Sequence, residues 1–172
     1  MRCPTELPTG IDRGSFPRMA NLLSTPRGLR RALAWWPPYR CAGIKVVHIA
    51  DDWSSARVRL RLGRFNRNYF GTHFGGSLYS MSDPFWVLLV VNRLGRDYLV
   101  WDKTGEIDFV SPGRGVVHTE FELTEDRVEE LRQATADGSK ALPWFESTVT
   151  AADGTVVARV RKQLYVRRKR GR

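Results

Sequence analysis

The stretch GTHFGGSLYSMSDPFWVLLVVNR, residues 71–93, decides the fold. Its glycine-rich first part, Gly71–Gly76, predicts a turn, and a helix is expected from Ser77 to Arg93. That helix carries apolar side chains on nearly every side, which is typical of a helix buried by surrounding structure. Leu94-Gly95 follows with the form of a helix C-cap. The segment therefore predicts one long, buried central helix.

Strands are predicted on both sides of this helix, because apolar and polar residues alternate there with a period of two. The strands are expected at residues 44–49, 56–62, 99–109, 117–123, 145–149 and 156–166. In the third of them, Leu99, Trp101, Ile107 and Phe109 share one parity, and a bulge is expected at Gly105. One long buried helix against an antiparallel sheet is an α+β arrangement.

Three shorter features complete the predicted layout. A first helix is expected over residues 21–36, interrupted by Pro26 and ended by Pro37-Pro38. Thr124 is expected to cap a second short helix over residues 125–136. Asp153-Gly154 predicts a two-residue hairpin turn.

Length and charge set the domain organisation. The chain has 172 residues, close to one average domain, and its 42% apolar residues exclude a mostly disordered chain. We expect a loose tail at residues 1–18, one domain at 19–166 and a basic tail at 167–172. Met19 is a candidate natural start. The 28 Lys and Arg against 18 Asp and Glu give a net charge of +10, half of which comes from the C-terminal tail.

Several functional classes are disfavoured by these counts. The two cysteines, Cys3 and Cys41, form no CxxC pair, so neither a disulfide scaffold nor a metal site is expected. The apolar run Pro84–Val91 is too short to span a bilayer, and the first residues lack a secretory apolar segment. A cytoplasmic protein is the default. A nucleic-acid-binding protein would suit the charge, but no motif for specific nucleic-acid recognition is present.

The motif NRNYFGTHFGGSLYSMSD, residues 66–83, resembles the turn and central helix of hot-dog-fold acyl-CoA thioesterases. LGRDYLVWDK (94–103) and EIDFVSPGR (106–114) add to the likeness. Together they are similar to a bacterial group described as tetrameric acyl-CoA thioesterases, over roughly residues 41–167. The resemblance implies a hot-dog fold, in which an antiparallel sheet wraps the central helix. It also implies a homo-oligomer, a dimer of dimers, with active sites at the interface of paired protomers, and no cofactor.

The resemblance implies a set of catalytic positions as well. Asn68 matches an asparagine ahead of the turn, Gly75-Gly76 matches the paired glycines at the helix start, and Asp83 matches the catalytic carboxylate. Related enzymes often carry histidine directly before the paired glycines. This chain has Phe74 there, with His73 one place earlier.

Elementary chemistry gives these residues plausible roles. Glycines at a helix N-terminus can present backbone N–H groups to a thioester carbonyl, aided by the helix dipole, although Gly75 and Gly76 would also suit a turn with positive φ. A carboxylate on an apolar helix is costly unless it is paired or used, so Asp83 is expected to activate water or to attack the thioester. Asn68 can orient the water or serve as an ordinary turn residue.

The remaining candidates concern substrate binding. His73 is expected either to donate to the substrate or to close the turn. Phe74 and Ser77 are expected to line the site, Ser77 without acting as a nucleophile. Lys103 and Arg114 are candidates for the coenzyme A phosphates, with an ordinary surface charge as the alternative for each.

Acyl-CoA thioester hydrolysis is thus the predicted activity. The principal alternative is a non-catalytic acyl-CoA-binding or regulatory domain, which would keep the glycine turn without needing Asp83. A hydratase or dehydratase would need a histidine with a carboxylate, but the His-Phe-Pro pattern of such enzymes is missing.

Overall fold

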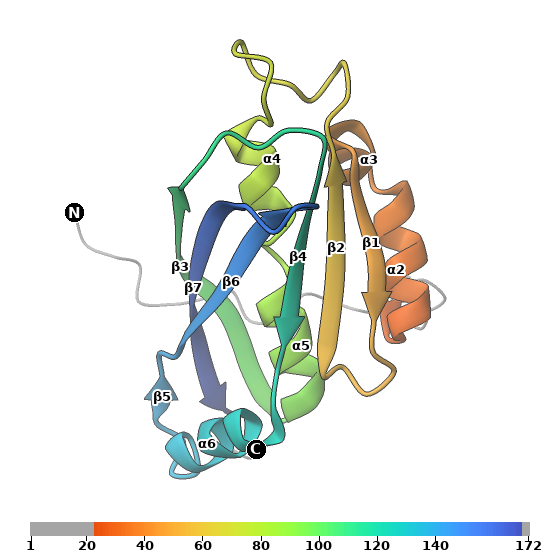
Figure 1. The fold of residues 1–172 in the computed structure, drawn as a ribbon. Coiled ribbons are helices and arrows are strands. Elements are labelled where there is room, and N and C mark those ends of the chain that lie inside the picture. The colour runs from red at the N-terminus through yellow and green to blue at the C-terminus, as the bar shows by residue number, and fades with distance from the viewer. Residues whose placement is uncertain (1–22, 170–172) are drawn as a thin grey trace, which may run out of the picture.

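A computed structural model describes residues 23–169 of the chain. The strands form one antiparallel sheet in the order β1-β2-β4-β6-β7-β3, and the short β5 pairs with β7 (Figure 1). The strands are β1 (Ile44–Ile49), β2 (Ser55–Arg61), β3 (Tyr98–Phe109), β4 (Val116–Glu122), β5 (Lys140–Ala141), β6 (Trp144–Ala151) and β7 (Val156–Arg168). The helices are α2 (Pro26–Trp35), α3 (Pro37–Ala42), α4 (Gly75–Ser80), α5 (Phe85–Leu94) and α6 (Glu125–Ala134).

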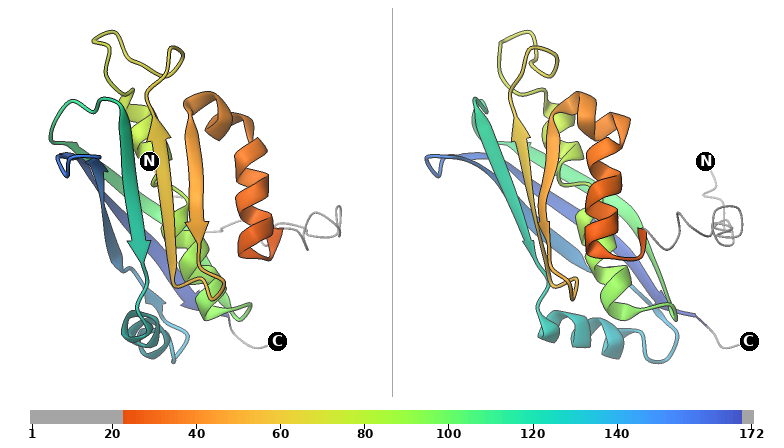
Figure 2. Two further views of the ribbon diagram at one scale, coloured as in Figure 1. Left: turned by 45° about the vertical axis from the view of Figure 1, so that its right-hand side comes forward. Right: turned by 90° about the vertical axis from the view of Figure 1, so that its right-hand side faces the viewer.

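The sheet curves around the central helical segment. Figure 2 shows α4 and α5 running along one face of the sheet, while α2 lies against β1 at the sheet's edge. The core fills the space between them, and Phe85 of α5 stacks on Phe121 of β4 with ring centroids 5.0 Å apart. The predicted α+β hot-dog fold, an antiparallel sheet around a buried central helix, is confirmed.

The central helix is interrupted, which corrects the expectation of one helix over Ser77–Arg93. It begins earlier, at Gly75, and α4 ends at Ser80; a turn of four residues separates it from α5, which starts at Phe85. Pro84 has no N–H with which to continue the helix. The Ser80 carbonyl that this proline leaves free instead accepts a hydrogen bond from the buried Tyr39 hydroxyl at 3.0 Å.

The N-terminal helix also differs from its prediction. The helical region is broken at Ser24 and Thr25, and Pro26 is the first residue of α2, which Thr25 caps by accepting from the Gly28 N–H at 3.1 Å. α2 ends at Trp35, just before Pro37-Pro38 as expected, but Pro37 also opens a second short helix, α3. Proline is favoured at a first helical position, where its missing N–H costs nothing.

The bulge in β3 lies at Lys103, not at Gly105. Asp102 pairs with Leu164 and Thr104 with Gln163, so Lys103 has no partner across the strand pair. A bulge adds one residue and therefore reverses which side chains face the helix beyond it. Trp101, which lies before the bulge and is exposed, therefore does not share a face with Ile107 and Phe109 beyond it.

The remaining boundaries are close to those expected. The Gly95 C-cap and the Thr124 N-cap are both confirmed, although α6 ends at Ala134 rather than Ala136. The β6–β7 hairpin has three loop residues instead of two, because Ala151 and Thr155 close it and Gly154 adopts a φ of 85°.

The last strand extends further than expected at the C-terminal end of the domain. β7 includes Arg167 and Arg168, so these two residues belong to the sheet and not to the expected basic tail. The expected N-terminal tail, Met19 and the residues after Lys169 lie outside the described residues. Over residues 23–169, no helix combines the length and apolar character that a membrane span requires.

Candidate active site

Asp83 lies in the turn between α4 and α5, where it meets a buried lysine. Lys162, from the middle of β7, donates a hydrogen bond to Asp83 Oδ1 at 2.7 Å. The lysine side chain is only 3% exposed, whereas the Asp83 side chain is 47% exposed. The carboxylate is therefore held from inside the protein and remains open to solvent on its other side.

Two further groups surround the Lys162 ammonium. Asp102 of β3 forms an ion pair with it at 3.0 Å, and the Tyr79 hydroxyl of α4 accepts a hydrogen bond from it at 3.3 Å. The ammonium also lies 5.4 Å from the centroid of the Tyr79 ring. β7, β3, α4 and the turn before α5 thus each contribute one member of a cluster: Lys162, Asp102, Tyr79 and Asp83.

The electrostatics of this cluster favour a charged lysine. Burial alone disfavours the ammonium, but hydrogen bonds to Asp83 and Asp102 outweigh burial and raise the pKa of Lys162 above its ordinary value. Burial raises the pKa of Asp102, against the opposing effect of Lys162. Burial, and secondarily the charge of Asp83, raise the pKa of Tyr39, so this phenol stays protonated and can donate to Ser80.

Gly105 makes room for the cluster. A Cβ atom built on Gly105 would lie 1.8 Å from the Tyr79 hydroxyl oxygen and 2.9 Å from its Cζ atom. The Gly105 φ is not in the left-handed region, so close approach and not backbone conformation requires glycine here. The absent side chain lets Tyr79 reach Lys162.

Replacing this glycine tests that packing. Gly105→Ala should lower the unfolding free energy by about 1–3 kcal/mol, because the new methyl group overpacks the Tyr79 hydroxyl. Gly63→Ala is a matched control, since its Cβ would meet only Asn66 at 3.6 Å. Adding Tyr79→Phe should recover part of the loss in the Gly105→Ala background. Denaturant melts measure all four proteins, and a Gly105→Ala variant as stable as the Gly63→Ala variant would contradict the packing argument.

Gly75 and Gly76 form the N-terminus of α4. As its first residues, they carry N–H groups that have no acceptor within the helix. Neither has a positive φ, so the alternative that they serve a strained turn is wrong. Both instead accommodate aromatic rings: a Cβ would lie 2.8 Å from Phe109 at Gly75 and 2.4 Å from Phe74 at Gly76.

Asn68 organises the loop ahead of α4. Its amide nitrogen donates to the Thr72 hydroxyl at 2.9 Å and to the His73 carbonyl at 3.2 Å. Its amide oxygen accepts from the N–H groups of Phe70 and Thr72 at 3.0 and 3.1 Å. These four bonds use the full capacity of the side chain. They favour the structural alternative for Asn68 over the orienting of a water molecule.

His73 is buried in this loop, next to Gly113. The backbone N–H of His73 donates to the Gly113 carbonyl at 3.0 Å, and this bond helps to close the turn. Neither nitrogen of the imidazole ring forms a hydrogen bond with any of the described residues. Burial lowers the pKa of His73, with a smaller opposing contribution from the backbone of Gly115. The imidazole is therefore held neutral.

The other expected binding residues come from separate parts of the chain. Phe74 is exposed and precedes α4, whereas Ser77 is buried within it. Lys103 is exposed at the β3 bulge, and Arg114 is exposed in the loop before β4.

Within one protomer, the N–H groups of Gly75 and Gly76 are separated from the Asp83 carboxylate by the length of α4. Gly75 opens α4, and Asp83 lies in the turn beyond its last residue, eight positions later. At a rise of ~1.5 Å per residue, the six residues of α4 alone span about 9 Å.

Comparison with known proteins identifies the family of this chain. The family model "Domain of unknown function (DUF4442)" matches residues 27–166. The chain belongs to this family. No curated protein matches its sequence.

Solved structures share the fold of this DUF4442 protein at low sequence identity. A Pseudomonas aeruginosa protein described as a probable thioesterase superposes with a TM-score of 0.72 at 19% identity, covering 81% of this chain and 93% of that one. A Haemophilus influenzae thioesterase gives 0.61 at 14%, covering 84% and 91%. The Escherichia coli PaaI protein, from the phenylacetic acid degradation operon, gives 0.56 at 14%, covering 83% and 91%.

Sequence reasoning singled out Asp83 in the DUF4442 protein but missed its partners. Lys162 stands between Val160 and Leu164 at inward-facing positions of the last strand, and a lysine there was an available signal. Asp102 and Tyr79 gave no such signal, because the bulge at Lys103 and the end of α4 at Ser80 determine where they point.

Proposed function

We propose that this DUF4442 protein hydrolyses acyl-CoA thioesters, with Asp83 as the group that drives the attack on the thioester. The observation that supports this most directly is the contrast at Asp83: one oxygen is held by the buried Lys162 ammonium, yet the carboxylate is nearly half exposed. A positioned carboxylate facing solvent suits a general base or a nucleophile.

The reaction balances by either route. As a base, Asp83 accepts a proton from a water molecule, and the resulting hydroxide adds to the thioester carbonyl carbon. The tetrahedral intermediate then expels the coenzyme A thiolate, which takes up the proton. As a nucleophile, the carboxylate displaces the thiolate, forming a mixed anhydride that water hydrolyses. Single turnover in ¹⁸O-labelled water tests the second route, because label enters Asp83 only when water attacks the aspartyl carbonyl of the anhydride.

The carbonyl oxygen is expected to bind at the N-terminus of α4. The N–H groups of Gly75 and Gly76 carry no intrahelical acceptor and can stabilise the developing oxyanion. Because the length of α4 separates the glycines from Asp83 of the same chain, the glycines and the carboxylate of one site are expected to come from two protomers. This separation supports the proposal of an oligomer.

The edge strand β3 is suited to form the protomer interface. It is the last strand of the sheet order, and its exposed side chains include Leu99, Trp101 and Phe109. Unpaired edges with exposed apolar side chains favour pairing with another chain.

Light scattering should therefore give a mass of two or four times 19.7 kDa. Trp101→Lys should shift the distribution toward monomer, because a charge at a paired edge opposes association. Leu23→Lys changes another exposed apolar residue, 41% exposed against 53% for Trp101, that lies outside the sheet, and it serves as the control. A monodisperse monomer at micromolar concentration would contradict the interface and the shared site together.

Substrate contacts follow from the exposed cations near α4. We propose that Arg114 and Lys103 bind the coenzyme A phosphates, and that Ser77, Phe74 and the neutral His73 line the pocket for the thioester end. Acyl-CoA is an intracellular metabolite, so the proposal carries a cytoplasmic location with it.

An acyl-CoA panel tests the function. Release of free thiol is followed for acyl chains from short to long and for an aryl-CoA. Turnover of at least one substrate that is far above the uncatalysed rate is the expected result. Binding of acyl-CoA, seen by calorimetry, without any turnover would replace hydrolysis by the binding-domain alternative.

A further inference from the structure

The sheet of this protein is split between β4 and β6. The two strands pair only at three positions, from Val117 opposite Ala151 to Thr119 opposite Val149. β4 continues to Glu122, and β6 begins at Trp144, but the described residues show no pairing between them beyond this point. Figure 1 shows the two strands diverging toward α6. Each strand therefore leaves one backbone edge without a strand partner.

An open cleft of about 1040 Å³ occupies this split. Its floor includes Trp86 of α5, whose indole lies between Phe121 of β4, at a centroid distance of 5.4 Å, and Phe145 of β6, at 4.8 Å. Directly paired strands are only ~4.8 Å apart. The Trp86 indole thus separates the inward-facing rings of the two strands beyond their last paired position.

Buried polar groups in this region lack partners. Trp86 Nε1 and Ser147 Oγ belong to residues of the lining, and Thr119 Oγ1 lies at the last paired position of β4. All three atoms are buried, and none has a hydrogen-bond partner among the described residues. Leaving a buried polar group unsatisfied costs ~1–3 kcal/mol. These atoms have almost no accessible surface, so they lie beneath the cleft rather than in its wall.

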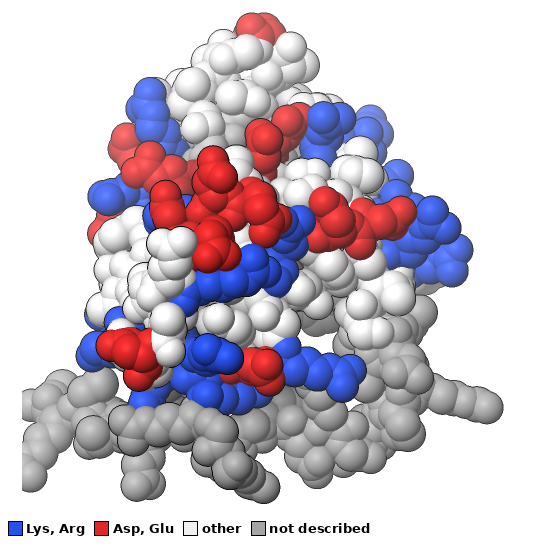
Figure 3. Space-filling model, turned by 90° about the horizontal axis from the view of Figure 1, so that it is seen from below, with Lys and Arg blue, Asp and Glu red and all other residues white. Residues whose placement is uncertain are grey.

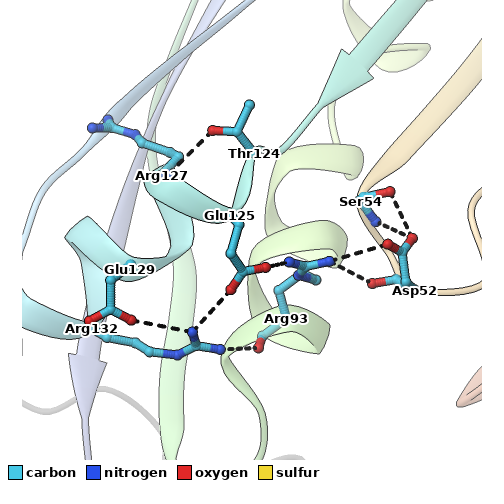
Figure 4. Close-up of polar contacts among 8 residues, drawn as sticks. All are labelled: Asp52, Ser54, Arg93, Thr124, Glu125, Arg127, Glu129 and Arg132. Carbon is cyan, nitrogen blue, oxygen red and sulfur yellow. Dashed lines mark hydrogen bonds and ion pairs between the residues drawn. The ribbon is translucent and has the colours of Figure 1, made fainter.

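The lower end of the cleft is fixed by a charged network. Figure 4 shows the Arg93 guanidinium between Asp52 and Glu125, all three of which line the cleft. Arg93 pairs with Asp52 at 3.4 Å and also with Glu125. Arg132 donates to the Arg93 carbonyl at 3.3 Å and so ties α6 to α5.

The rim is acidic although the chain carries a net charge of +10. Both arginines that line the cleft, Arg57 and Arg93, are already paired with carboxylates of the same lining. Viewed from the α6 end, acidic side chains gather on the surface with basic ones beside them (Figure 3). The lining carboxylates are Asp52, Glu120, Glu122, Glu125 and Glu146. Asp52, Glu120, Glu125 and Glu146 are themselves paired with arginines, so the excess of negative charge comes from five carboxylates against the two arginines of the lining.

The side chains on both strands alternate in the same sense. On β4, Phe121 points inward between the exposed Glu120 and Glu122. On β6, Phe145 and Ser147 point inward on either side of the exposed Glu146. A strand placed in the gap would meet an apolar floor with every second side chain and acidic groups with the others.

We propose that the cleft between β4 and β6 binds an extended cationic peptide, with alternating apolar and basic side chains. Its backbone pairs with the free strand edges, antiparallel to one and parallel to the other. Its apolar side chains pack on Trp86 and Phe121, and its lysine or arginine side chains pair with the acidic rim. This site is separate from Asp83 and does not depend on thioester hydrolysis.

Fluorescence anisotropy with a labelled peptide of alternating lysine and valine tests the proposal on the full chain. Glu146→Lys should weaken binding at least tenfold, whereas Glu129→Lys should leave it unchanged. Both residues form exposed ion pairs, but Glu129 lies on α6 outside the cleft. Binding should also weaken with rising salt, and the Trp86 indole N–H resonance should move on titration.

Three results would overturn the proposal. The first is equal binding by the Glu146→Lys and Glu129→Lys variants. The second is equal affinity for a peptide of alternating glutamate and valine. The third is a shift of the Trp86 resonance by a fatty acid but not by the lysine peptide, which would identify a lipid cleft. A second copy of the chain as occupant would appear as a concentration-dependent shift without peptide.

Discussion

Asp83→Asn should lower the rate of thioester hydrolysis by roughly 10²–10⁴-fold, the contribution expected of a positioned general base. Asparagine keeps the shape of the side chain but can neither accept the proton from water nor attack the carbonyl. Free-thiol release with the best acyl-CoA measures the loss. Asp108→Asn removes an exposed carboxylate of β3 that lies outside the cluster, and it should retain the wild-type rate.

The variant is expected to remain folded, because Lys162 keeps two contacts. The amide oxygen of the asparagine can still accept from the ammonium, and Asp102 retains its full charge at 3.0 Å. Acyl-CoA affinity, measured by calorimetry, should therefore change little. A folded Asp83→Asn variant that hydrolyses its substrate at nearly the wild-type rate would remove Asp83 from the mechanism.

The fold was predictable from the sequence because buried and exposed residues alternate along the individual strands of the sheet. In β2 and β4, each buried residue is followed by a more exposed one, and this period of two is visible without knowing the strand's neighbours. The interruption at Pro84 was harder to place. A proline inside an apolar helical pattern can kink, end or begin a helix. The Tyr39 hydroxyl, which bonds the freed Ser80 carbonyl, lies 41 residues before Ser80 in the chain.

The candidate site was predictable only in part, for the same reason. Asp83 stands out in an apolar segment, and from sequence alone its charge had no purpose other than chemistry. The structure shows a second role for this charge. Lys162, 79 residues later, is buried, and a buried ammonium is tolerated only with a carboxylate such as Asp83 beside it. The extra residue at Lys103 also reverses the alternation of side chains along β3. A prediction that assumes strict alternation therefore places Asp102 on the wrong face of the sheet.

Lys162→Met should destabilise the protein by about 3 kcal/mol at neutral pH, the lower end of the cost of breaking a buried ion pair. Methionine fills a similar volume but leaves Asp83 and Asp102 together without a cation. Their side chains are 47% and 35% exposed, so water relieves part of the repulsion and keeps the loss from being larger. At ~2–4 °C per kcal/mol, the melting temperature should fall by roughly 6–12 °C.

The pH dependence gives this prediction a definite sign. The pKa of Lys162 is raised in the folded protein, so its stabilising contribution is fully present below the ordinary lysine value of ~10.4 and is lost as the pH rises above it. The stability gap between wild type and Lys162→Met should therefore stay constant from neutral pH to about 9 and close in alkali.

A neutral version of the cluster separates charge from packing. Combining Lys162→Met with Asp83→Asn and Asp102→Asn removes all three charges while keeping similar volumes, so the melting temperature should recover toward that of wild type. Hydrolysis should fall as far as in Asp83→Asn, because no carboxylate of the cluster remains to activate water. If Lys162→Met alone melts at the wild-type temperature, or if the neutral combination is no more stable than Lys162→Met, the buried ion pair does not hold Asp83 in place.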